Sequence, residues 1–364
     1  MSWTKRVLVF SLPIMIFLFA IEVGSYFLWD FMSDKRHGGV FVVKSIIGEP
    51  SLNNTQTIIS HPYSLYWNNP AYSDEFGRQY DENGYRSLPY IKQEKELRIL
   101  VLGGSTTNSY PFVKDPQKIW TAQLQKILEE KFRRPVHVFN AGLPSGTSAE
   151  LMVHYLQVGK FKNPHLVVFH EGGNDVLPLL FPNYRTDYAH FRKPAVGGPR
   201  PYERKLLTYS YTARVIYMVW MRSGIGVYSS KPHSLEKISR HEALQMVKSN
   251  ESIAFGSNVT TIVRESIENG SKVLLVGFLQ ARQDSLSKNR PDLAGLEPAL
   301  VLGVEKHDQI MSNIASRYQQ TFLKLNQSKF DDSWFLDNCH LNEDGEFEKA
   351  RQIAAKIIEI NLYK

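Results

Sequence analysis

Short, mostly apolar runs recur through the last two thirds of the chain and predict the strands of a buried sheet. Runs of roughly four to eight apolar residues between polar or glycine-rich stretches are typical of strands in parallel sheets, which are covered on both faces. The first run ends at the pair Gly103-Gly104. The predicted strands are Leu97–Leu102, Val136–Phe139, Leu166–Phe169 and Val273–Val276.

Segments with the apolar spacing of helices separate these runs. In the first segment Trp120, Leu124 and Leu128 recur every four residues, so they share one face of a helix. Ser148 is a candidate N-cap for a later helix. Strands that alternate with helices predict an α/β domain, a three-layer α/β/α (flavodoxin-like) fold with a parallel sheet. The predicted helices are Ile119–Phe132, Ser148–Val158, Ser252–Glu268 and Asn342–Ile360.

A long apolar segment, Val7 to Trp29, lies near the N-terminus and predicts an uncleaved, single-pass signal-anchor helix. Its length suffices to cross a hydrocarbon core of about 30 Å. Lys5 and Arg6 precede it, which predicts a cytoplasmic N-terminus and an extracytoplasmic remainder, periplasmic or at the cell surface. A cleaved signal peptide is the alternative, although no small-residue cleavage site follows. Glu22 lies toward the outer end, where it can reach the interface or pair with a partner helix.

The hydropathy pattern divides the chain into three predicted parts. Residues 1–30 are the transmembrane helix, and residues 31–95 form an aromatic, turn-rich stem that we expect to pack on the main domain. Residues 96–364 form that domain, interrupted at 185–250 by an insertion or cap where the alternation of strands and helices fails. The insertion is rich in basic residues and tyrosines, a composition that suits sugars, anionic groups or a phospholipid headgroup.

Charge and cysteine content narrow the range of functions. The formal net charge is +7 over 364 residues, and neither a basic helix nor a nucleic-acid-binding motif is visible, so we expect no nucleic-acid partner. The chain has one cysteine, which excludes an intrachain disulfide and a cysteine-based metal site. Cys339 could be read as a nucleophile, but a spacer in a tight turn is the simpler interpretation.

Four short segments contain the residue types of an acyl-transfer site. Ser105 follows the first predicted strand, and ligands of open α/β sheets lie beyond the carboxyl ends of the strands. A serine nucleophile needs an adjacent base, and His340 with Asp337 three residues earlier could supply the base and its orienting carboxylate. Gly142 and Asn174 each follow another predicted strand, and their backbone and side-chain N–H groups are candidate oxyanion donors.

Each of these residues also has a simpler interpretation. Ser105 could be a capping or phosphate-loop serine, although no Gly-Lys-Ser/Thr follows it. Asp337 and His340 could form a surface ion pair, and Gly142 and Asn174 could serve a turn.

Three further polar residues near the third predicted strand are not expected to take part in catalysis. Asp175 is expected to cap the segment that follows it. His165 and His170 flank the strand without metal-ligand spacing, so we expect them to be structural or to face substrate. We predict no metal and no cofactor.

Together the four segments resemble the motif set of the SGNH (GDSL-type) hydrolases, which are named after Ser, Gly, Asn and His in four sequence blocks. The matching residues are Ser105, Gly142, Asn174 and His340, with Asp337 in the Asp-x-x-His position. The resemblance implies that Ser105 attacks an ester carbonyl and that His340 accepts its proton. The N–H groups of Ser105 and Gly142 and the Asn174 side chain would form the oxyanion hole. One departure is that the first block reads Gly-Gly-Ser, where the family often has Gly-Asp-Ser.

An anchor, an aromatic stem and this motif set are together similar to membrane-tethered members of the family from bacterial envelopes. Several of these remove or transfer acyl groups on polysaccharides. The resemblance implies a membrane-anchored serine esterase that hydrolyses O-acyl esters, chiefly O-acetyl esters, of an envelope or secreted glycan through an acyl-serine. The alternatives are an O-acyltransferase that uses the same residues, a lipase or lysophospholipase, and a non-catalytic glycan-binding or assembly protein.

Overall fold

The computed structural model describes residues 3–34, 43, 47, 57–61, 63–191, 201–222, 239–281 and 295–360. The chain divides into two compact units, residues 1–60 with 194–231, and residues 61–193 with 232–364.

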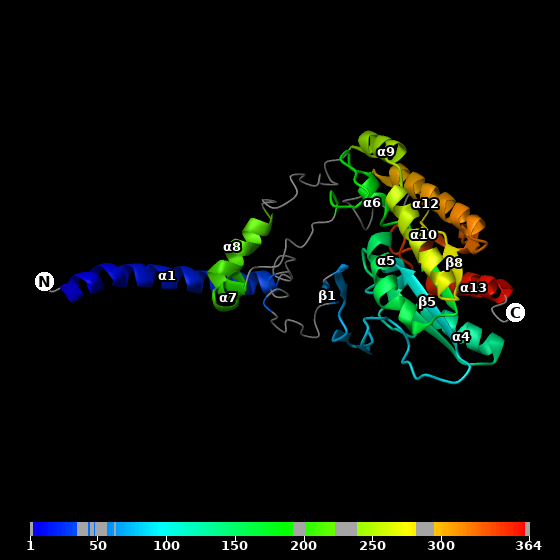
Figure 1. Cartoon of the computed structure of the whole chain (residues 1–364), viewed down its shortest axis with the longest axis horizontal. Coiled ribbons are helices and arrows are strands. Elements are labelled where there is room, and N and C mark those ends of the chain that lie inside the picture. The colour runs from blue at the N-terminus through cyan, green and yellow to red at the C-terminus, as the bar shows by residue number, and fades with distance from the viewer. Residues whose placement is uncertain are drawn as a thin grey trace. The chain divides into compact units, whose positions relative to one another are not determined.

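A five-stranded parallel sheet forms the centre of the second unit, which confirms the predicted α/β fold (Figure 1). Its strand order, β6-β5-β7-β8-β9, is that of a doubly wound, flavodoxin-like sheet. The order reverses between β5 and β7, and ligands of such sheets bind beyond the carboxyl ends of the strands at this reversal. The strands are β5 (Leu97–Gly103), β6 (Val136–Gly142), β7 (Leu166–His170), β8 (Lys272–Val276) and β9 (Thr321–Leu323).

Helices cover both faces of the sheet, because successive side chains of each strand point to opposite faces. Ile99 of β5 is buried in a cluster with α4 (Trp120–Phe132) and α13 (Glu343–Ile360). Leu100, the next residue, belongs to the cluster on the other face. The helices of that second cluster are α5 (Ser148–Gln157), α10 (Ile253–Glu268) and α12 (Glu297–Arg317).

The four predicted strands and four predicted helices are present, with ends shifted by a few residues. The N-cap of α5 is Thr147 and not Ser148, because Thr147 forms a capping box with Glu150. The sequence analysis predicted neither α12 nor β9. The buried face of α12 includes His307 and Asp308, which interrupt the apolar spacing, and β9 has only three residues.

The segment before β5 packs on the sheet unit through buried aromatic and polar residues. Trp67 stacks on His154 of α5, with ring centroids 3.8 Å apart. The Asn68 side chain donates to the carbonyl of Gly142 at 2.8 Å. Arg86 is fully buried, and its guanidinium donates to four carbonyl or amide oxygens. The short strands of this part are β1 (Ile58–His61), β2 (Leu65–Asn68), β3 (Ser73–Asp74) and β4 (Gly77–Arg78).

Short helices complete the second unit. The helix α9 lies within the predicted insertion and buries Ala243 and Val247 against α6 and α12. These helices are α3 (Ser105–Asn108), α6 (Val176–Leu179), α9 (Arg240–Ser249), η1 (Gly159–Lys162), η4 (Gln327–Lys329) and η5 (Asp332–Trp334).

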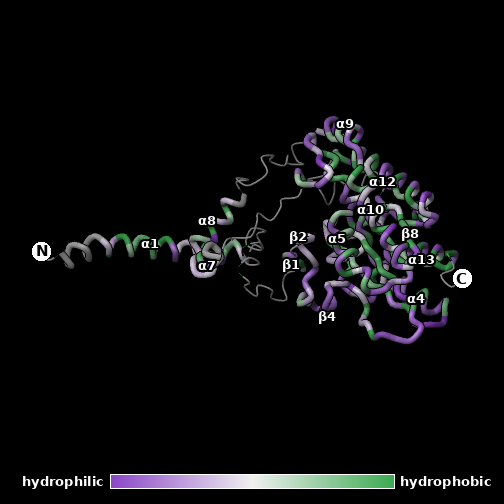
Figure 2. Tube along the Cα trace, in the orientation of Figure 1, coloured by the Kyte–Doolittle hydropathy of each residue, from purple (hydrophilic) through white to green (hydrophobic). Residues whose placement is uncertain are grey.

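The first unit contains one helix, among the described residues, that is long and apolar enough to span a membrane. It is α1 (Trp3–Asp34), whose segment Ser11–Ser33 has a mean hydropathy of 1.8 (Figure 2). Two helices of the predicted insertion, α7 (Pro201–Tyr209) and α8 (Tyr211–Arg222), belong to this unit, and α8 packs directly on α1. The sequence analysis did not predict this packing partner.

We expect Arg86→Met to lower the free energy of unfolding by about 3 kcal/mol or more, because several buried carbonyl oxygens lose their donor at about 1–3 kcal/mol each. Urea unfolding of the detergent-solubilised chain measures this. Arg78→Met is the matched control, because Arg78 is exposed and should change stability by about 0.5 kcal/mol or less. Equal, small effects of the two substitutions would contradict the structural role of Arg86.

Candidate active site

Ser105 lies at the carboxyl end of β5, where the strand turns into α3. Gly104 is the N-cap of this helix and Ser105 is its first residue. The side chain of Ser105 is partly exposed, so a ligand can reach it. Because the first N–H groups of a helix have no partner within it, the Ser105 N–H is a candidate donor at this edge.

Gly104 lies in close contact with two side chains from the end of β7. A Cβ atom there would lie 2.1 Å from Oε2 of Glu171 and 2.7 Å from Nδ2 of Asn174. A larger residue at this position would therefore require both side chains to move. A carboxyl group lies beside the serine turn, and it comes from Glu171, at the end of β7.

His340 and Asp337 complete a hydrogen-bonded series with Ser105. The Nε2 atom of His340 lies 2.7 Å from Oγ of Ser105, and its Nδ1 atom lies 2.6 Å from Oδ2 of Asp337. The other carboxylate oxygen of Asp337 accepts from the backbone N–H groups of Cys339 and His340, which fixes the turn. The structure thus brings together three predicted residues in the order nucleophile, base and carboxylate, across 235 residues of sequence.

The surroundings of Asp337 favour its charged form. Burial alone would raise the pKa of Asp337, but the hydrogen bond and charge interaction with His340 and the backbone N–H donors outweigh it, so the pKa is lowered. Phe112 stacks on the imidazole of His340, with ring centroids 3.8 Å apart and an interplanar angle of 12°. Phe112 limits the rotation of this ring and is 36% exposed at the site. The sequence analysis did not identify it.

Asn174 lies on the other side of the Ser105 turn and is partly exposed. Its Nδ2 atom donates to the carbonyl of Gly146 at 2.9 Å and lies 3.4 Å from Oε2 of Glu171. Its backbone N–H donates to Oε1 of Glu171 at 2.7 Å. Asn174 is therefore held beside the nucleophile turn by Glu171 and by the loop that precedes α5. Neither Glu171 nor Gly146 was identified from sequence.

Gly142, by contrast, is not directed at the site. Its N–H donates to Oδ1 of Asn140 at 2.9 Å, and its carbonyl accepts from the side chains of Asn68 and Asn108. A Cβ atom at Gly142 would lie 2.3 Å from the backbone N of Asn108 in α3. This geometry favours a structural role, in which the missing side chain lets α3 lie directly on β6.

Asp175 occupies the N-cap position of α6, as expected from sequence, but its side chain makes no capping hydrogen bond there. Its carboxylate accepts instead from the backbone N–H and Oγ of Ser148, at 2.8 and 2.6 Å, and from the Tyr188 hydroxyl at 2.7 Å. It therefore caps the start of α5 across the sheet edge. Burial raises the pKa of Asp175 to about 6, against the lowering effect of these hydrogen bonds.

The two histidines that flank β7 lie at opposite ends of the strand, His165 at its start and His170 at its end. His170 is buried, which lowers its pKa to about 3 and keeps the ring neutral. Nδ1 of His165 accepts from the backbone N–H of Arg98 at 3.0 Å. Potential ligand atoms of Asp337, Cys339 and His340 lie within 4.8 Å of one another. A metal bound to Nδ1 of His340 would displace its hydrogen bond to Asp337. This group could therefore bind a metal only if the hydrogen-bonded series of Ser105, His340 and Asp337 were broken.

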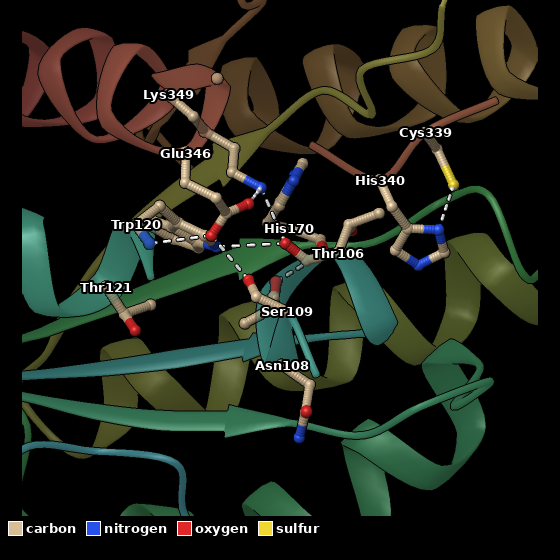
Figure 3. A network of polar contacts seen from close by, with 12 residues as sticks. Thr106, Asn108, Ser109, Trp120, Thr121, His170, Cys339, His340, Glu346 and Lys349 are labelled. Carbon is tan, nitrogen blue, oxygen red and sulfur yellow. Dashed lines mark hydrogen bonds and ion pairs between the residues drawn. The ribbon is translucent and has the colours of Figure 1, made fainter. Parts of the chain in front are cut away.

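A buried ion pair on α13 contacts the helix that starts with the nucleophile (Figure 3). Nζ of Lys349 lies 3.0 Å from Oε1 of Glu346 and donates to the carbonyl of Thr106 at 2.7 Å. Oε2 of Glu346 accepts from Oγ of Ser109 at 2.6 Å and from the backbone N–H of Trp120 at 2.8 Å. Because α13 begins three residues after His340, this network fixes the helix after His340 against the helix that starts with Ser105.

Comparisons with known proteins give structural neighbours of low similarity. No protein-family model matches the sequence, and no curated protein matches it. An acetylxylan esterase from Geobacillus stearothermophilus has a TM-score of 0.41 and 12% identity, over 72% of this chain and 94% of that one. A lipase/acylhydrolase from Enterococcus faecalis has a TM-score of 0.41 and 13% identity, over 72% and 96%. A GDSL-like lipase from Bacteroides thetaiotaomicron has a TM-score of 0.39 and 15% identity, over 75% and 93%.

The buried carboxyl group of Glu171 predicts a pH dependence of stability. Burial and repulsion from Asp175 raise its pKa to about 8, against the lowering effect of backbone N–H donors. The folded chain therefore keeps a proton that the unfolded chain releases above its own pKa near 4.5. Stability should fall as pH rises between these two values, with a limiting slope of about 1.4 kcal/mol per pH unit.

Glu171→Gln should flatten this dependence, because the amide does not titrate. Melting temperatures of wild type and variant between pH 5 and pH 8.5 measure the difference. Glu268→Gln is the matched control, because Glu268 is exposed at the end of α10. Parallel curves for wild type and Glu171→Gln would contradict a protonated Glu171.

The buried ion pair of Glu346 and Lys349 predicts how single and double substitutions change the free energy of unfolding. Lys349→Met leaves a buried carboxylate without its cation and should cost about 3–5 kcal/mol of unfolding free energy. The double variant with Glu346→Gln should cost less than the single one, because no charge stays uncompensated. Urea unfolding of both variants tests this, and a double variant with the summed loss of two single variants would count against the ion pair.

Proposed function

We propose that this protein is a membrane-anchored serine esterase that hydrolyses O-acyl esters, chiefly O-acetyl esters, of an envelope or secreted glycan. The observation that carries the proposal is the hydrogen-bonded series of Ser105, His340 and Asp337, with separations of 2.7 and 2.6 Å. A serine, a histidine and a carboxylate in this order form an activated nucleophile on many unrelated folds. The partly exposed Ser105 at the strand-order reversal gives a substrate access to it.

In the acylation step, Oγ of Ser105 attacks the ester carbonyl carbon while Nε2 of His340 takes the hydroxyl proton. The charge of Asp337 stabilises the imidazolium that forms and holds its ring orientation. Negative charge develops on the carbonyl oxygen, where the Ser105 N–H and Nδ2 of Asn174 are the proposed donors. Nδ2 of Asn174 would exchange its long contact with Oε2 of Glu171, at 3.4 Å, for this oxygen. One such side-chain donor lowers the activation barrier by about 2.7–4 kcal/mol. As the C–O bond breaks, His340 gives its proton to the leaving alcohol oxygen.

Deacylation repeats these steps with water. His340 takes a proton from water as the water oxygen attacks the acyl-serine carbonyl, and it then returns a proton to Oγ of Ser105. The products are the free acid and the starting enzyme, so the cycle balances without a cofactor. A sugar hydroxyl in place of water would give the acyltransferase reaction, which makes the acceptor a measurable alternative.

The proposed location follows from α1. Its apolar segment Ser11–Ser33 is long enough to cross a membrane, and Lys5 and Arg6 precede it. By the positive-inside bias this orientation puts the catalytic unit outside the cytoplasm, where envelope and secreted glycans are found. The glycan itself is proposed from the sequence resemblance to membrane-tethered hydrolases of bacterial envelopes.

Fluorophosphonate labelling of the full-length chain in detergent tests the nucleophile. We expect one adduct per chain, found on Ser105 by peptide mass spectrometry and absent from Ser105→Ala. Ester hydrolysis by Ser105→Ala should fall by about 10³-fold or more, with unfolding free energy near that of wild type. Ser257→Ala, an exposed serine on α10, is the matched control and should keep both label and activity. Equal activity of Ser105→Ala and wild type would overturn the mechanism.

Substrate comparison tests the proposed reaction class. Acetyl esters should be hydrolysed faster than long-chain acyl esters, and added glycan acceptors should not capture the acyl group in preference to water. Preference for long acyl chains would favour a lipase, and acylated glycan as the main product would favour the acyltransferase. A folded chain with neither label nor turnover would favour a binding protein.

A further inference from the structure

The helices α7 and α8 expose large apolar side chains although they lie in a basic part of the sequence. On α8, Ile216 is 62% exposed, Val219 58% and Trp220 38%. On α7, Leu206 is 59% exposed and Tyr209 84%. Soluble surfaces seldom gather apolar residues in this way, and contiguous exposed patches mark protein or membrane contacts.

The exposed residues of α8 form a stripe separate from the one that packs on α1. Ile216, Val219 and Trp220 follow the i, i+3, i+4 spacing of one helix face. Tyr211 and Met218 lie in the cluster with Trp29 of α1. One side of α8 is thus covered by α1, while Ile216 and Val219, on a second apolar side, stay largely exposed.

The contact between α1 and α8 satisfies the acidic residue of the apolar helix. The carboxylate of Glu22 accepts from Oγ of Ser210 at 2.9 Å and from the backbone N–H groups of Tyr211 and Thr212. Glu22 therefore caps the N-terminus of α8, where the helix dipole also favours negative charge. Oγ of Ser25 lies 3.1 Å from Oγ1 of Thr212, one turn farther along α1.

The buried basic residue of α8, Arg214, also finds hydrogen-bond partners within this unit. Arg214 is buried, and its guanidinium donates to the carbonyls of Leu207 and Thr208 at 2.8 and 3.0 Å, at the end of α7. The same guanidinium lies over the rings of Tyr211 and Trp29, at 4.6 and 5.4 Å from their centroids. Backbone and charged groups of this kind must be satisfied internally wherever a helix contacts lipid.

We propose that α7 and α8 form an interfacial hairpin that lies in the outer lipid leaflet against α1, with Ile216, Val219 and Trp220 in contact with acyl chains. This inference rests on the proposed anchoring of α1. The hairpin adds a lipid-binding surface to the single membrane-spanning helix, and its occupant is the bilayer itself.

The expected depth of Glu22 in the bilayer agrees with a hairpin in the outer leaflet. From Val7, the first residue after Lys5 and Arg6, the helix rises about 22 Å to Glu22 at about 1.5 Å per residue. The hydrocarbon core is about 30 Å thick, which leaves Glu22 about 8 Å below its outer boundary. Interfacial helices bury their apolar face about 5–10 Å into this boundary. The N-terminus of α8, bound to Glu22, therefore has the depth of an interfacial helix.

Lipid fits the exposed stripe because the adjoining surface of α1 has the same chemistry. Phe19 and Phe27 of α1 are 72% and 65% exposed. The bilayer that covers these residues extends past α1 onto whatever packs beside it. A covering protein surface is the competing occupant, and it is an outcome of the following test.

The test uses the full-length chain with Cys339→Ser, which removes its natural thiol, and one new cysteine labelled with an environment-sensitive fluorophore. The labelled positions are Ile216, Phe19 of α1 as the membrane control, and Gln309 of α12 as the exposed control. Each protein is reconstituted into phosphatidylcholine vesicles with or without brominated acyl chains. We expect quenching at Ile216 within about twofold of that at Phe19, as for a shallow interfacial helix, and none at Gln309.

Each other outcome has a definite meaning. Quenching at Phe19 without quenching at Ile216 would overturn the hairpin and leave the anchor in place. A blue-shifted but unquenched label at Ile216 would show a protein cover and also overturn it. Absence of quenching at both Phe19 and Ile216 would reject the anchor together with the hairpin.

A substitution of Glu22 tests the link between the two helices. Glu22→Ala removes the cap of α8 and should reduce quenching at Ile216 while quenching at Phe19 persists. Glu22→Gln is the matched control, because its amide oxygen still accepts a hydrogen bond and should retain much of the quenching. Unchanged quenching at Ile216 in Glu22→Ala would contradict the role of the cap.

Discussion

The unit of the five-stranded sheet depends on close packing at the carboxyl end of β5. Gly104 lies so close to Glu171 and Asn174 that a Cβ atom there would displace their side chains. This close approach brings the end of β7 against the turn that presents Ser105. In a sheet whose strand order reverses between β5 and β7, the two neighbouring strand ends then bring Ser105 and Asn174 to the same edge of the sheet.

A second constraint joins the distant end of the chain to this position. The turn with Asp337 and His340 belongs to the segment before α13, and α13 is fixed against α3 by the buried pair Glu346 and Lys349. Burial of two charges is costly, so such a pair is weak evidence for stability by itself. Its geometric effect is more specific, because the Thr106 carbonyl that Lys349 holds belongs to the residue after Ser105. The separation of serine and histidine thus follows from how two helices pack.

The sequence predicts the parts of this structure that follow local rules. Apolar runs identify β5 and β7, and the Asp-x-x-His spacing of Asp337 and His340 corresponds to the observed turn. Prediction fails where a partner is distant in sequence. Phe112 has no motif of its own and is recognised only by its stacking on His340. Gly142 was considered only from its position after a strand, whereas its carbonyl accepts from the distant side chains of Asn68 and Asn108.

The unpredicted helix α12 and the unexpected partners of Asp175 have the same physical cause. A buried polar side chain interrupts the apolar pattern that predicts an element, and its partner is found only in three dimensions. His307 of α12 bonds the Gly172 carbonyl and Ser252, and Asp175 bonds Ser148.

Glu22 is the same case in a hydrophobic helix: the sequence marks it as costly, and the structure gives it the N-terminus of α8. Buried polar groups without partners cost more free energy than most single contacts supply. Residues that break a hydropathy pattern are therefore the best guides to long-range contacts in this chain, in the catalytic unit and in the unit of α1 alike.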